Sequence, residues 1–330
     1  MDDRQAMELA IERAAAVRTL TSPNPWVGAV VLDQYGEPVG VGATEPPGGA
    51  HAEVLALGAA GSGARNGTLV STLEPCSHQG RTPPCVEAAI AAGVSRVVVA
   101  VLDPDDKVAG TGVAALRAAG VTVDVGILAD QVSRQLEPYL HHRRTGRPYV
   151  VCKLAATLDG ATAAADGSSR WITGKAARTD VHRLRAESDA IVVGAGTVRA
   201  DDPSLTVRRV EGADPLRVVL GRAPASARIH PCLEWSGDLG SLLDELGRRG
   251  VLQAMVEGGS TVVRALHDQD LVDRYVVYLA PALIGGRDMV PLLSGPSAPS
   301  IDSVWRGRFV AMTPLGDDVR LDLVPADRCT

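Results

Sequence analysis

Aromatic side chains are scarce in this sequence of 330 residues, which contains one Phe, five Tyr and four Trp. The sequence also lacks an excess of positive charge, because its formal net charge is −6. An acidic chain with so few rings does not have the interleaved basic and stacking residues of a nucleic-acid-binding surface. We therefore expect no nucleic-acid partner, and a core built mainly from Ala, Val, Leu and Ile.

Cysteines and long apolar runs are also rare. The five cysteines are Cys76, Cys85, Cys152, Cys232 and Cys329. An odd number in a chain of this length does not indicate a disulfide framework and favours a reducing compartment. Residues 1–19 lack the basic start and apolar run of a signal peptide, and no apolar run reaches the roughly 18 residues of a membrane span. We expect a cytoplasmic protein without membrane association.

The length indicates two domains, at roughly 100–200 residues per domain. Hydrophobic residues make up 45% of the chain, which is enough for a core in each domain. A polar, turn-rich junction occupies residues 143–148, with the sequence Arg-Arg-Thr-Gly-Arg-Pro. We therefore predict one domain over residues 1–146 and a second over residues 147–330.

Hydrophobic periodicity predicts an α/β pattern in both halves. In the first half we expect helices at 4–18, 51–60, 85–92, 112–119 and 129–142, and strands at 27–32, 39–41, 68–72, 96–102 and 121–125. In the second half we expect strands at 149–155, 190–193, 216–220, 251–256 and 273–280, and helices at 175–186, 239–249 and 260–267. This alternation predicts sheets with parallel strand pairs.

A potential zinc site lies in the first half. His51 is followed two residues later by Glu53, and Cys76 and Cys85 each follow a proline. A catalytic zinc commonly takes three protein ligands and keeps one position for water, so His51, Cys76 and Cys85 are candidate ligands. Glu53 can lie beside the metal and transfer protons without binding it, as in nucleobase deaminases. The pattern predicts a zinc-dependent deaminase acting on an amino-heterocycle.

Two other interpretations stay open for these residues, namely a structural zinc site and unrelated cysteines. Catalysis is favoured because His51 and Cys85 each begin a predicted helix, where partial positive charge stabilises thiolate and hydroxide. The spacing differs from the usual deaminase pattern, because residues 77–84 separate the cysteines where two residues are common. We interpret Cys152, Cys232 and Cys329 as packing or surface residues.

Several longer motifs extend over both halves. In the first half they are PNPWVG at 23–28, GAHAE at 49–53 and EPCSHQGRTPPC at 74–85. In the second half they are KLAATLDG at 153–160, SRWIT at 169–173, DAIVVG at 189–194 and EGG at 257–259. Together they resemble the bifunctional deaminase–reductase family of riboflavin biosynthesis over nearly the whole chain. The long spacer between the cysteines is that family's own form of the motif.

The resemblance implies a cytidine-deaminase-like three-layer domain followed by a dihydrofolate-reductase-like α/β domain. It also implies two reactions. The first is hydrolytic deamination of 2,5-diamino-6-(5-phosphoribosylamino)pyrimidin-4-one, and the second is reduction of the ribosyl group to ribityl. The implied cofactors are one Zn²⁺ per chain and NADPH. The implied partners are a small phosphorylated pyrimidine and further copies of the chain, in a dimer or a larger homo-oligomer.

By motif match, Asn24, Arg81 and Asp103 are expected to contact the deaminase substrate. Arg81 is expected at its polar tail, and the alternative for Arg81 is a solvated loop residue. The family usually has Asp-Pro-Asn-Pro after a strand, whereas this chain has Asp103-Pro104-Asp105-Asp106. The contact that the usual asparagine makes is therefore not expected in the same form.

The second half has no strand–GxGxxG–helix unit, so a Rossmann fold is not indicated. The resemblance assigns the cofactor to Ala155, Trp171, Thr197 and Asp201, and helix-opening amides at Gly258, Gly259 and Ser260 are expected to hold its pyrophosphate. It assigns the reductase substrate to Lys153, Ser169, Arg185, Leu205, Arg208 and Glu257. Guanidinium groups suit a phosphate, although single arginines are often surface charges. Each of the other assignments also has a plainer alternative. The Gly258–Ser260 segment could be an ordinary strand-to-helix turn, Trp171 could be a core residue, and Lys153 could lie at an exposed strand edge.

The segment between residues 220 and 251 is short for the family. We predict no clear strand between residues 222 and 238, where only 229–233 is a candidate. This leaves a second hypothesis, a deaminase whose reductase-like domain is structural or dimerising. A third hypothesis, a nucleic-acid editor that binds RNA through its second domain, is opposed by the acidic composition.

Overall fold

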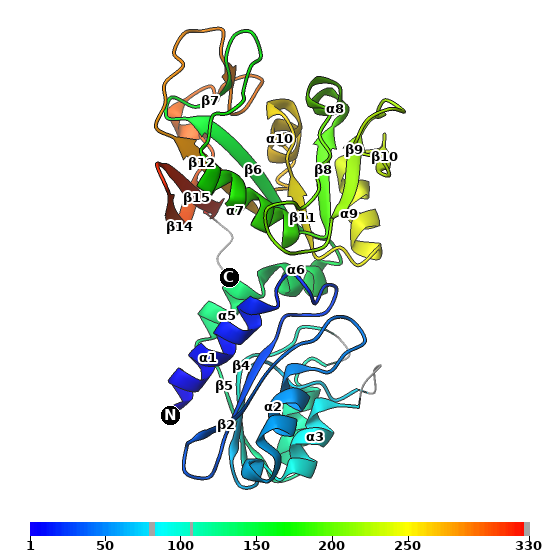
Figure 1. Cartoon of the computed structure of the whole chain (residues 1–330), viewed down its shortest axis with the longest axis vertical. Coiled ribbons are helices and arrows are strands. Elements are labelled where there is room, and N and C mark those ends of the chain that lie inside the picture. Colours follow the sequence, from blue (N-terminus) through cyan, green and yellow to red (C-terminus); the bar gives the residue numbers. More distant parts are fainter. Residues whose placement is uncertain (79–82, 106–107, 327–330) are drawn as a thin grey trace. The chain divides into compact units, whose positions relative to one another are not determined.

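The computed structural model of the chain describes residues 1–78, 83–105 and 108–326. These residues form two compact units, Met1–Gly146 and Arg147–Thr330 (Figure 1). Both units consist of helices packed on a predominantly apolar sheet. Among the described residues, no helix is long and apolar enough to cross a membrane.

Unit 1, Met1–Gly146, contains six helices and five strands among its described residues. The helices are α1 (Asp3–Ala16), α2 (Ala52–Ala60), α3 (Cys85–Ala92), α4 (Thr111–Ala118), α5 (Ala129–Gln135) and α6 (Glu137–Thr145), and a 3-10 turn η1 covers Gly61–Ala64. The strands are β1 (Gly28–Leu32), β2 (Pro38–Ala43), β3 (Thr68–Leu73), β4 (Arg96–Val101) and β5 (Thr122–Val125). Every predicted element of this half is present to within two residues, apart from the helix predicted at 129–142.

The prediction of one helix at 129–142 is wrong, because the chain forms two helices there. Helix α5 ends at Gln135, and α6 begins at Glu137 with Leu136 as its N-cap residue. Pro138 lies in the first turn of α6, where its missing N–H is not needed. A proline at this position cannot continue the hydrogen bonds of a preceding helix, which explains the break.

The strands of unit 1 form one sheet in the order β2-β1-β3-β4-β5, in which β3, β4 and β5 are parallel. A Cβ atom at Gly28 would lie 1.9 Å from the carbonyl oxygen of Ala10 in α1, and one at Gly42 would lie 2.2 Å from that of Ala52 in α2. Gly28 pairs with Ala43, so Gly28 and Gly42 face opposite sides of the sheet. Helices therefore cover both faces, and the predicted three-layer domain is confirmed.

Unit 2, Arg147–Thr330, is built on a larger sheet. Its helices are α7 (Lys175–Ala186), α8 (Ala195–Asp201), α9 (Leu239–Arg248) and α10 (Ser260–His267), with a 3-10 turn η2 at Ile301–Ser303. Its strands are β6 (Tyr149–Thr157), β7 (Ala161–Ala163), β8 (Ala190–Gly194), β9 (Leu216–Leu220), β10 (Leu233–Trp235), β11 (Gln253–Val256), β12 (Arg274–Ala280), β13 (Val290–Pro291), β14 (Gly307–Leu315) and β15 (Asp318–Pro325). The predicted elements of this half are all present to within two residues.

Eight of these strands form one sheet in the order β10-β9-β8-β11-β6-β12-β15-β14, while β7 and β13 form a separate pair. The strands from β10 to β12 are parallel, and β15 and β14 are antiparallel. Along β6, Val150 and Cys152 belong to one apolar cluster, with α9 and α10, whereas Tyr149 and Val151 belong to the other, with α7. The sheet thus has a core on each face, as an α/β domain with parallel strands requires.

The absence of a strand between residues 222 and 238 was a wrong prediction. Residues Leu233–Trp235 form β10, which pairs with β9 in parallel and extends the edge of the sheet. Three residues are too few to produce a visible periodicity, and Glu234 interrupts the apolar pattern. Helix α8 and strands β14 and β15 were not predicted either.

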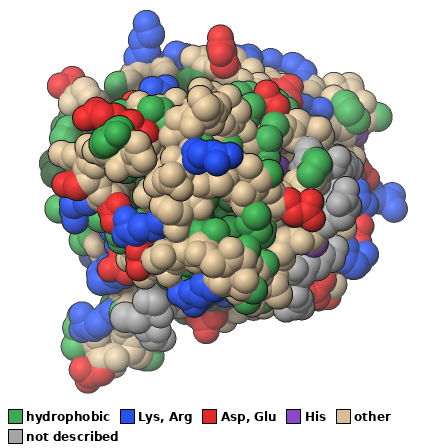
Figure 2. Space-filling model, turned by 90° about the horizontal axis from the view of Figure 1, so that it is seen from below, with side chains coloured by type: hydrophobic (Ala, Val, Ile, Leu, Met, Phe, Trp, Pro, Cys, Tyr) green, Lys and Arg blue, Asp and Glu red, His purple; other side chains and the backbone are tan. Residues whose placement is uncertain are grey.

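Charged side chains are distributed over the surface in both signs. On the face of the molecule in Figure 2, basic and acidic side chains of the described residues are interspersed and form no continuous basic patch.

Candidate active sites

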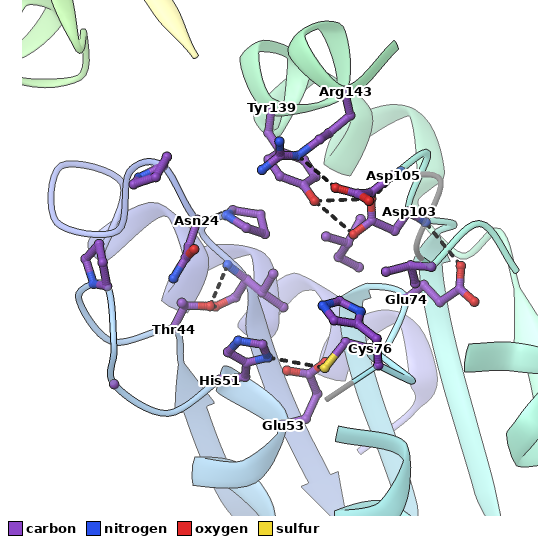
Figure 3. A pocket seen from close by; sticks show the side chains of 18 of the residues that line it. Asn24, Thr44, His51, Glu53, Glu74, Cys76, Asp103, Asp105, Tyr139 and Arg143 are labelled. Atoms are coloured by element: carbon purple, nitrogen blue, oxygen red, sulfur yellow. Dashed lines mark hydrogen bonds and ion pairs between the residues drawn. The ribbon is translucent and has the colours of Figure 1, made fainter. Parts of the chain in front are cut away.

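A cavity of about 390 Å³ opens in unit 1 beyond the carboxyl ends of β3 and β4 (Figure 3). This volume is in the range of small-molecule sites, roughly 300–1,000 Å³. The predicted residues Asn24, His51, Glu53, Cys76 and Asp103 all line the cavity. Five positions separated by up to 79 residues in the sequence therefore meet at one pocket.

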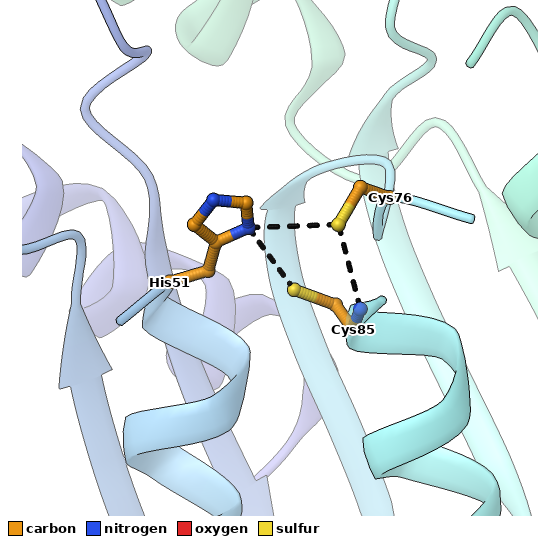
Figure 4. A group of neighbouring side chains, drawn as sticks. All are labelled: His51, Cys76 and Cys85. Atoms are coloured by element: carbon orange, nitrogen blue, oxygen red, sulfur yellow. Dashed lines mark hydrogen bonds between the residues drawn. The ribbon is translucent and has the colours of Figure 1, made fainter. Parts of the chain in front are cut away.

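Three potential metal ligands lie close together (Figure 4), and two of them, His51 and Cys76, line this pocket. The Nδ1 atom of His51 lies 3.3 Å from Sγ of Cys85 and 3.5 Å from Sγ of Cys76. All three ligand atoms lie within 4.8 Å of one another, and they are the one group of this kind among the described residues. The backbone N–H of Cys85 also donates to Sγ of Cys76 at 3.4 Å.

Local structure explains why these side chains converge. His51 is the N-cap residue of α2, and Cys85 is the first residue of α3, as predicted. Both side chains therefore lie at helix N-termini, whose partial positive charge favours thiolate. Gly42 of β2 lets the first turn of α2 approach the sheet closely, because any Cβ there would collide with the backbone of Ala52.

The donor set fits a tetrahedral zinc ion. Zinc–sulfur and zinc–nitrogen bonds of about 2.3 and 2.0–2.1 Å place tetrahedral ligand atoms roughly 3.5–3.8 Å apart. The two distances from His51 Nδ1 are close to this range. The side-chain contact between the two thiols lowers the pKa of Cys76 and raises the pKa of Cys85. A divalent cation favours deprotonation of both thiols, so its binding releases protons.

Glu53 lies in the first turn of α2, next to the ligand cluster, and only 4% of it is exposed. Burial raises the pKa of its carboxyl to about 7, and the neighbouring His51 acts in the opposite direction. A carboxyl whose pKa is close to the working pH is suited to accept and return protons. Its place in the pocket suits the proton transfer expected for it.

The opposite wall of the pocket is a hydrogen-bonded frame around Asp103. The hydroxyl of Tyr139 donates to the Asp103 carboxylate at 2.9 and 3.2 Å, and the backbone N–H of Asp105 donates to it at 2.9 Å. Burial raises the pKa of Asp103. Glu74 accepts hydrogen bonds from the backbone N–H groups of Asp103, Gly110 and Val113, at 3.2, 3.0 and 3.0 Å. The segment after β4 is thereby fixed to the end of β3.

Sequence reasoning missed Glu74, Tyr139 and Arg143, which all line the cavity. Glu74 directly precedes Pro75-Cys76, so the motif did contain a signal for it. Tyr139 and Arg143 lie on α6 and reach the pocket through tertiary packing, for which the sequence has no local signal. Arg81, expected at the polar tail of the substrate, lies outside the described residues.

The predicted reductase residues in unit 2 include a buried ion pair. Arg185 of α7 donates to Oε1 of Glu257 from Nε at 3.2 Å and from Nη2 at 2.8 Å. Its Nη1 donates to the carbonyl oxygen of Thr206 at 2.7 Å. Burial acts to raise the pKa of Glu257, but the charges of Arg185 and Lys153 hold it below its usual value. Arg185, Glu257 and Lys153 thus form one charged group, at the end of β11 and beside the middle of β6.

A second arginine is accessible beside this ion pair. Arg208 is exposed, and its guanidinium donates to the hydroxyls of Ser204 and Thr206. The backbone N–H of Arg208 donates to Nδ1 of His182, a buried residue that sequence reasoning missed, at 3.1 Å. Leu205 is also buried and has a positive φ of 50°, so its backbone turns sharply at this point.

The predicted cofactor residues are grouped less tightly. Ser260 begins α10 with Gly259 as the N-cap, and the Cβ position of Gly259 is 3.8 Å from Oγ1 of Thr197 in α8. Trp171 is 69% exposed, and the guanidinium of Arg178 lies over its ring at 4.7 Å, so a core role for Trp171 does not apply. The remaining predicted residues are Ala155 on β6, Ser169 in the loop before α7, Asp201 at the end of α8, paired with Arg170, and Gly258 before α10.

The His/Cys/Cys donor set, the adjoining Glu53 and the three-layer fold define unit 1 as a zinc-binding domain of the cytidine-deaminase class. Residues 1–101 match the family described as the cytidine and deoxycytidylate deaminase zinc-binding region. Residues 148–321 match the RibD C-terminal domain.

Relatives match over nearly the whole chain. The riboflavin biosynthesis protein RibD of Mycobacterium tuberculosis is 44% identical, with 97% of this chain and 96% of that protein covered. RibD of Escherichia coli is 38% identical, with 99% and 100% covered. A structure of Acinetobacter baumannii RibD has a TM-score of 0.92 at 37% identity and covers 98% and 99% of the two chains. The chain therefore belongs to the RibD family, in which a zinc-binding deaminase domain is joined to a reductase domain.

A further solved structure is that of a diaminohydroxyphosphoribosylaminopyrimidine deaminase/5-amino-6-(5-phosphoribosylamino)uracil reductase from Thermotoga maritima. It has a TM-score of 0.91 at 32% identity, and it covers 98% of this chain and 99% of its own. The chain thus contains both domains of the family. It is an enzyme that acts on a small molecule and uses zinc and NADPH.

Proposed function

We propose that residues 1–146 deaminate 2,5-diamino-6-(5-phosphoribosylamino)pyrimidin-4-one and that residues 147–330 reduce the ribosyl group of the product to ribityl. The observation that carries this proposal is the cluster of His51, Cys76 and Cys85 beside Glu53, in a cavity of the size of one small ligand. The name of the Thermotoga maritima relative supports the two substrates.

In the deaminase site, His51, Cys76 and Cys85 would hold zinc, which supplies Lewis-acid activation of water at neutral pH. Glu53 takes a proton from the attacking water and returns it to the leaving amine. Water thus replaces the 2-amino group, and ammonia departs. Asn24 and Asp103 line the same cavity and orient the pyrimidine ring toward Glu53.

In the reductase site, NADPH supplies the hydride. The amides at the start of α10, with Gly259 and Ser260, hold the pyrophosphate beside Thr197 of α8. Arg208 is accessible and binds the phosphate of the substrate. Arg185 mainly stabilises the site, because its N–H groups already donate to Glu257 and to the carbonyl oxygen of Thr206. The pair keeps Glu257 ionised next to Lys153 of the central strand β6.

The enzyme works in the cytoplasm as a homo-oligomer of two or more chains. In support of a reducing compartment, the described cysteines are free. In support of association, strand β14 is at the edge of the sheet and exposes Phe309 by 53% and Met312 by 69%. Light scattering on the full chain tests this: a mass of one chain for the wild type, or an unchanged mass for Met312→Lys, contradicts association through β14.

Purified protein loaded with zinc tests the two reactions. With the diaminopyrimidine substrate we expect ammonia release without NADPH, and NADPH oxidation only after deamination. Ammonia release without any NADPH oxidation would instead support the alternative of a deaminase with a structural second domain.

A further inference from the structure

The wall of the deaminase pocket carries an excess of negative charge. Glu53, Glu74, Asp103 and Asp105 all line the cavity. Among the described lining residues, Arg143 is the one arginine or lysine. A phosphorylated substrate adds further negative charge to this wall, and Arg143 is placed to offset it.

Arg143 is held from two sides but stays accessible from the cavity. Its Nε lies 3.3 Å from Oδ2 of Asp105, and its guanidinium carbon lies 5.0 Å from the centre of the Tyr139 ring. The side chains of Arg143 and Asp105 are 29% and 25% exposed, so water and ligand reach both. Figure 3 shows the Arg143 side chain next to Tyr139 and Asp105, across the cavity from His51 and Glu53.

The support beneath Arg143 is rigid. Tyr139 is bound through its hydroxyl to Asp103, and Asp105 is bound through its backbone to the same carboxylate. Glu74 in turn holds the backbone of Asp103. Arg143 therefore does not swing freely on a long side chain. A pre-oriented guanidinium loses less conformational entropy when it binds an anion.

Asp105 explains why a cation is needed at this point. It adds a carboxylate to a pocket wall that already contains Glu53, Glu74 and Asp103. The ion pair with Arg143 offsets that charge. A guanidinium keeps donors free for a phosphate while it contacts a carboxylate, because it has five N–H groups in a planar fork.

We infer that Arg143 is a specificity-determining residue of the deaminase site, which recognises the phosphate of the substrate, and that Asp105 is a positioning residue that orients it. This inference rests on the proposed deaminase function. It concerns the phosphorylated end of the substrate and leaves the reacting amine to Glu53 and the zinc ligands.

The test compares two substrates in the zinc-loaded full-length enzyme: the phosphorylated diaminopyrimidine and the same compound after removal of its phosphate. For Arg143→Ala we expect kcat/KM on the phosphorylated substrate to fall about 10–100-fold, mostly through KM, since one charge-assisted contact is lost. On the phosphate-free substrate we expect a change of less than about twofold. Equal losses on both substrates, or no loss on either, would overturn the inference.

Two further variants sharpen the result. Arg144→Ala removes the neighbouring exposed arginine of α6 and should leave both substrates unaffected. Arg143→Ala combined with Asp105→Asn should recover part of the lost kcat/KM on the phosphorylated substrate, because the repulsive carboxylate is gone. A double variant no better than Arg143→Ala would overturn the role of Asp105. Failure of the wild type to deaminate either substrate would refute the proposed function itself, which is a distinct outcome.

Discussion

Each unit of this protein contains a buried glutamate, and the two carboxyls are shifted in opposite directions. Burial raises the pKa of Glu53 in unit 1 to about 7. The side chain of Glu257 in unit 2 is only 13% exposed as well, but Arg185 and Lys153 hold its pKa below the usual value. A buried carboxyl without a protein cation is ready to exchange protons, whereas one with an arginine remains an anion. The first is thus suited to chemistry and the second to holding a site together.

The two sites also differ in how completely the folded chain assembles them. The three candidate zinc ligands meet within 4.8 Å of one another. In unit 2, Arg185 and Glu257 are joined, but Trp171 and Arg208 are exposed around them. A metal needs its donor atoms together in advance, while a dinucleotide and a sugar phosphate contact residues spread over many strands and loops.

Removal of zinc should have the largest effect and should separate the two units. Incubation with a strong chelator is expected to abolish deamination, since Glu53 has then no activated water to deprotonate. Reduction of the deaminated intermediate should continue, because unit 2 contains no such donor cluster among its described residues. Restored zinc should restore the rate, as measured by ammonia release.

Cysteine variants provide the matched control for zinc removal. Cys85→Ser should lose zinc by elemental analysis, whereas Cys232→Ser, a free cysteine outside the cluster, should keep one ion per chain. Zinc retained at full stoichiometry in Cys85→Ser would exclude Cys85 as a ligand.

Glu53→Gln should reduce kcat for deamination by at least about 100-fold, because general acid–base groups commonly contribute about 10²–10⁴-fold. The zinc content should be unchanged, since Glu53 is not in the donor set. Glu87→Gln, at an exposed glutamate in the first turn of α3, is the matched control and should be as active as the wild type. Wild-type turnover by Glu53→Gln would remove the proton-transfer role.

Arg185→Ala should act on stability. It leaves Glu257 buried without its main partner, which costs about 3–5 kcal/mol in comparable buried pairs. We expect a lower free energy of unfolding of the full chain in urea, with loss of NADPH oxidation and unchanged deamination. Arg183→Ala, at an exposed position of the same helix, should be neutral. Equal stability of the Arg185→Ala and Arg183→Ala variants would contradict this account.

Protonation of His182 should have the smallest effect, which is a dependence of the free energy of unfolding on pH. Burial, followed by the charges of Arg185 and Arg208, lowers its pKa from 6.5 to about 4. Between these values the unfolded chain binds the proton and the folded chain does not. Stability should therefore fall as the pH falls from about 6.5 to about 4. His182→Asn should lack this component in urea titrations, and an imidazole NMR titration near pH 6.5 would refute the shift.

The sequence was sufficient for the features that depend on local pattern. His51, Glu53, Cys76 and Cys85 stand in short motifs with helix starts, and the structure brings them together. Most helices and strands also follow from periodicity. Side chains that act through tertiary contacts could not be predicted in this way. Arg143 and His182 gain their surroundings only when α6 and α7 pack against distant loops.

Two kinds of structural detail were beyond sequence reasoning for a different reason. Strand β10 has only three residues, so its pairing with β9, and not its own composition, makes it a strand. The break between α5 and α6 depends on one proline, Pro138, within an otherwise helical pattern. Such short signals are outweighed by the periodicity of their neighbours.

The central claim is that one chain carries two chemically independent sites. The most direct measurement supplies the Glu53→Gln enzyme with the deaminated intermediate and NADPH, and follows NADPH oxidation and the mass of the product. We predict the wild-type rate of reduction and a ribityl product from an enzyme that cannot deaminate. Loss of reduction together with deamination, in a variant that keeps its zinc and its stability, would contradict the account.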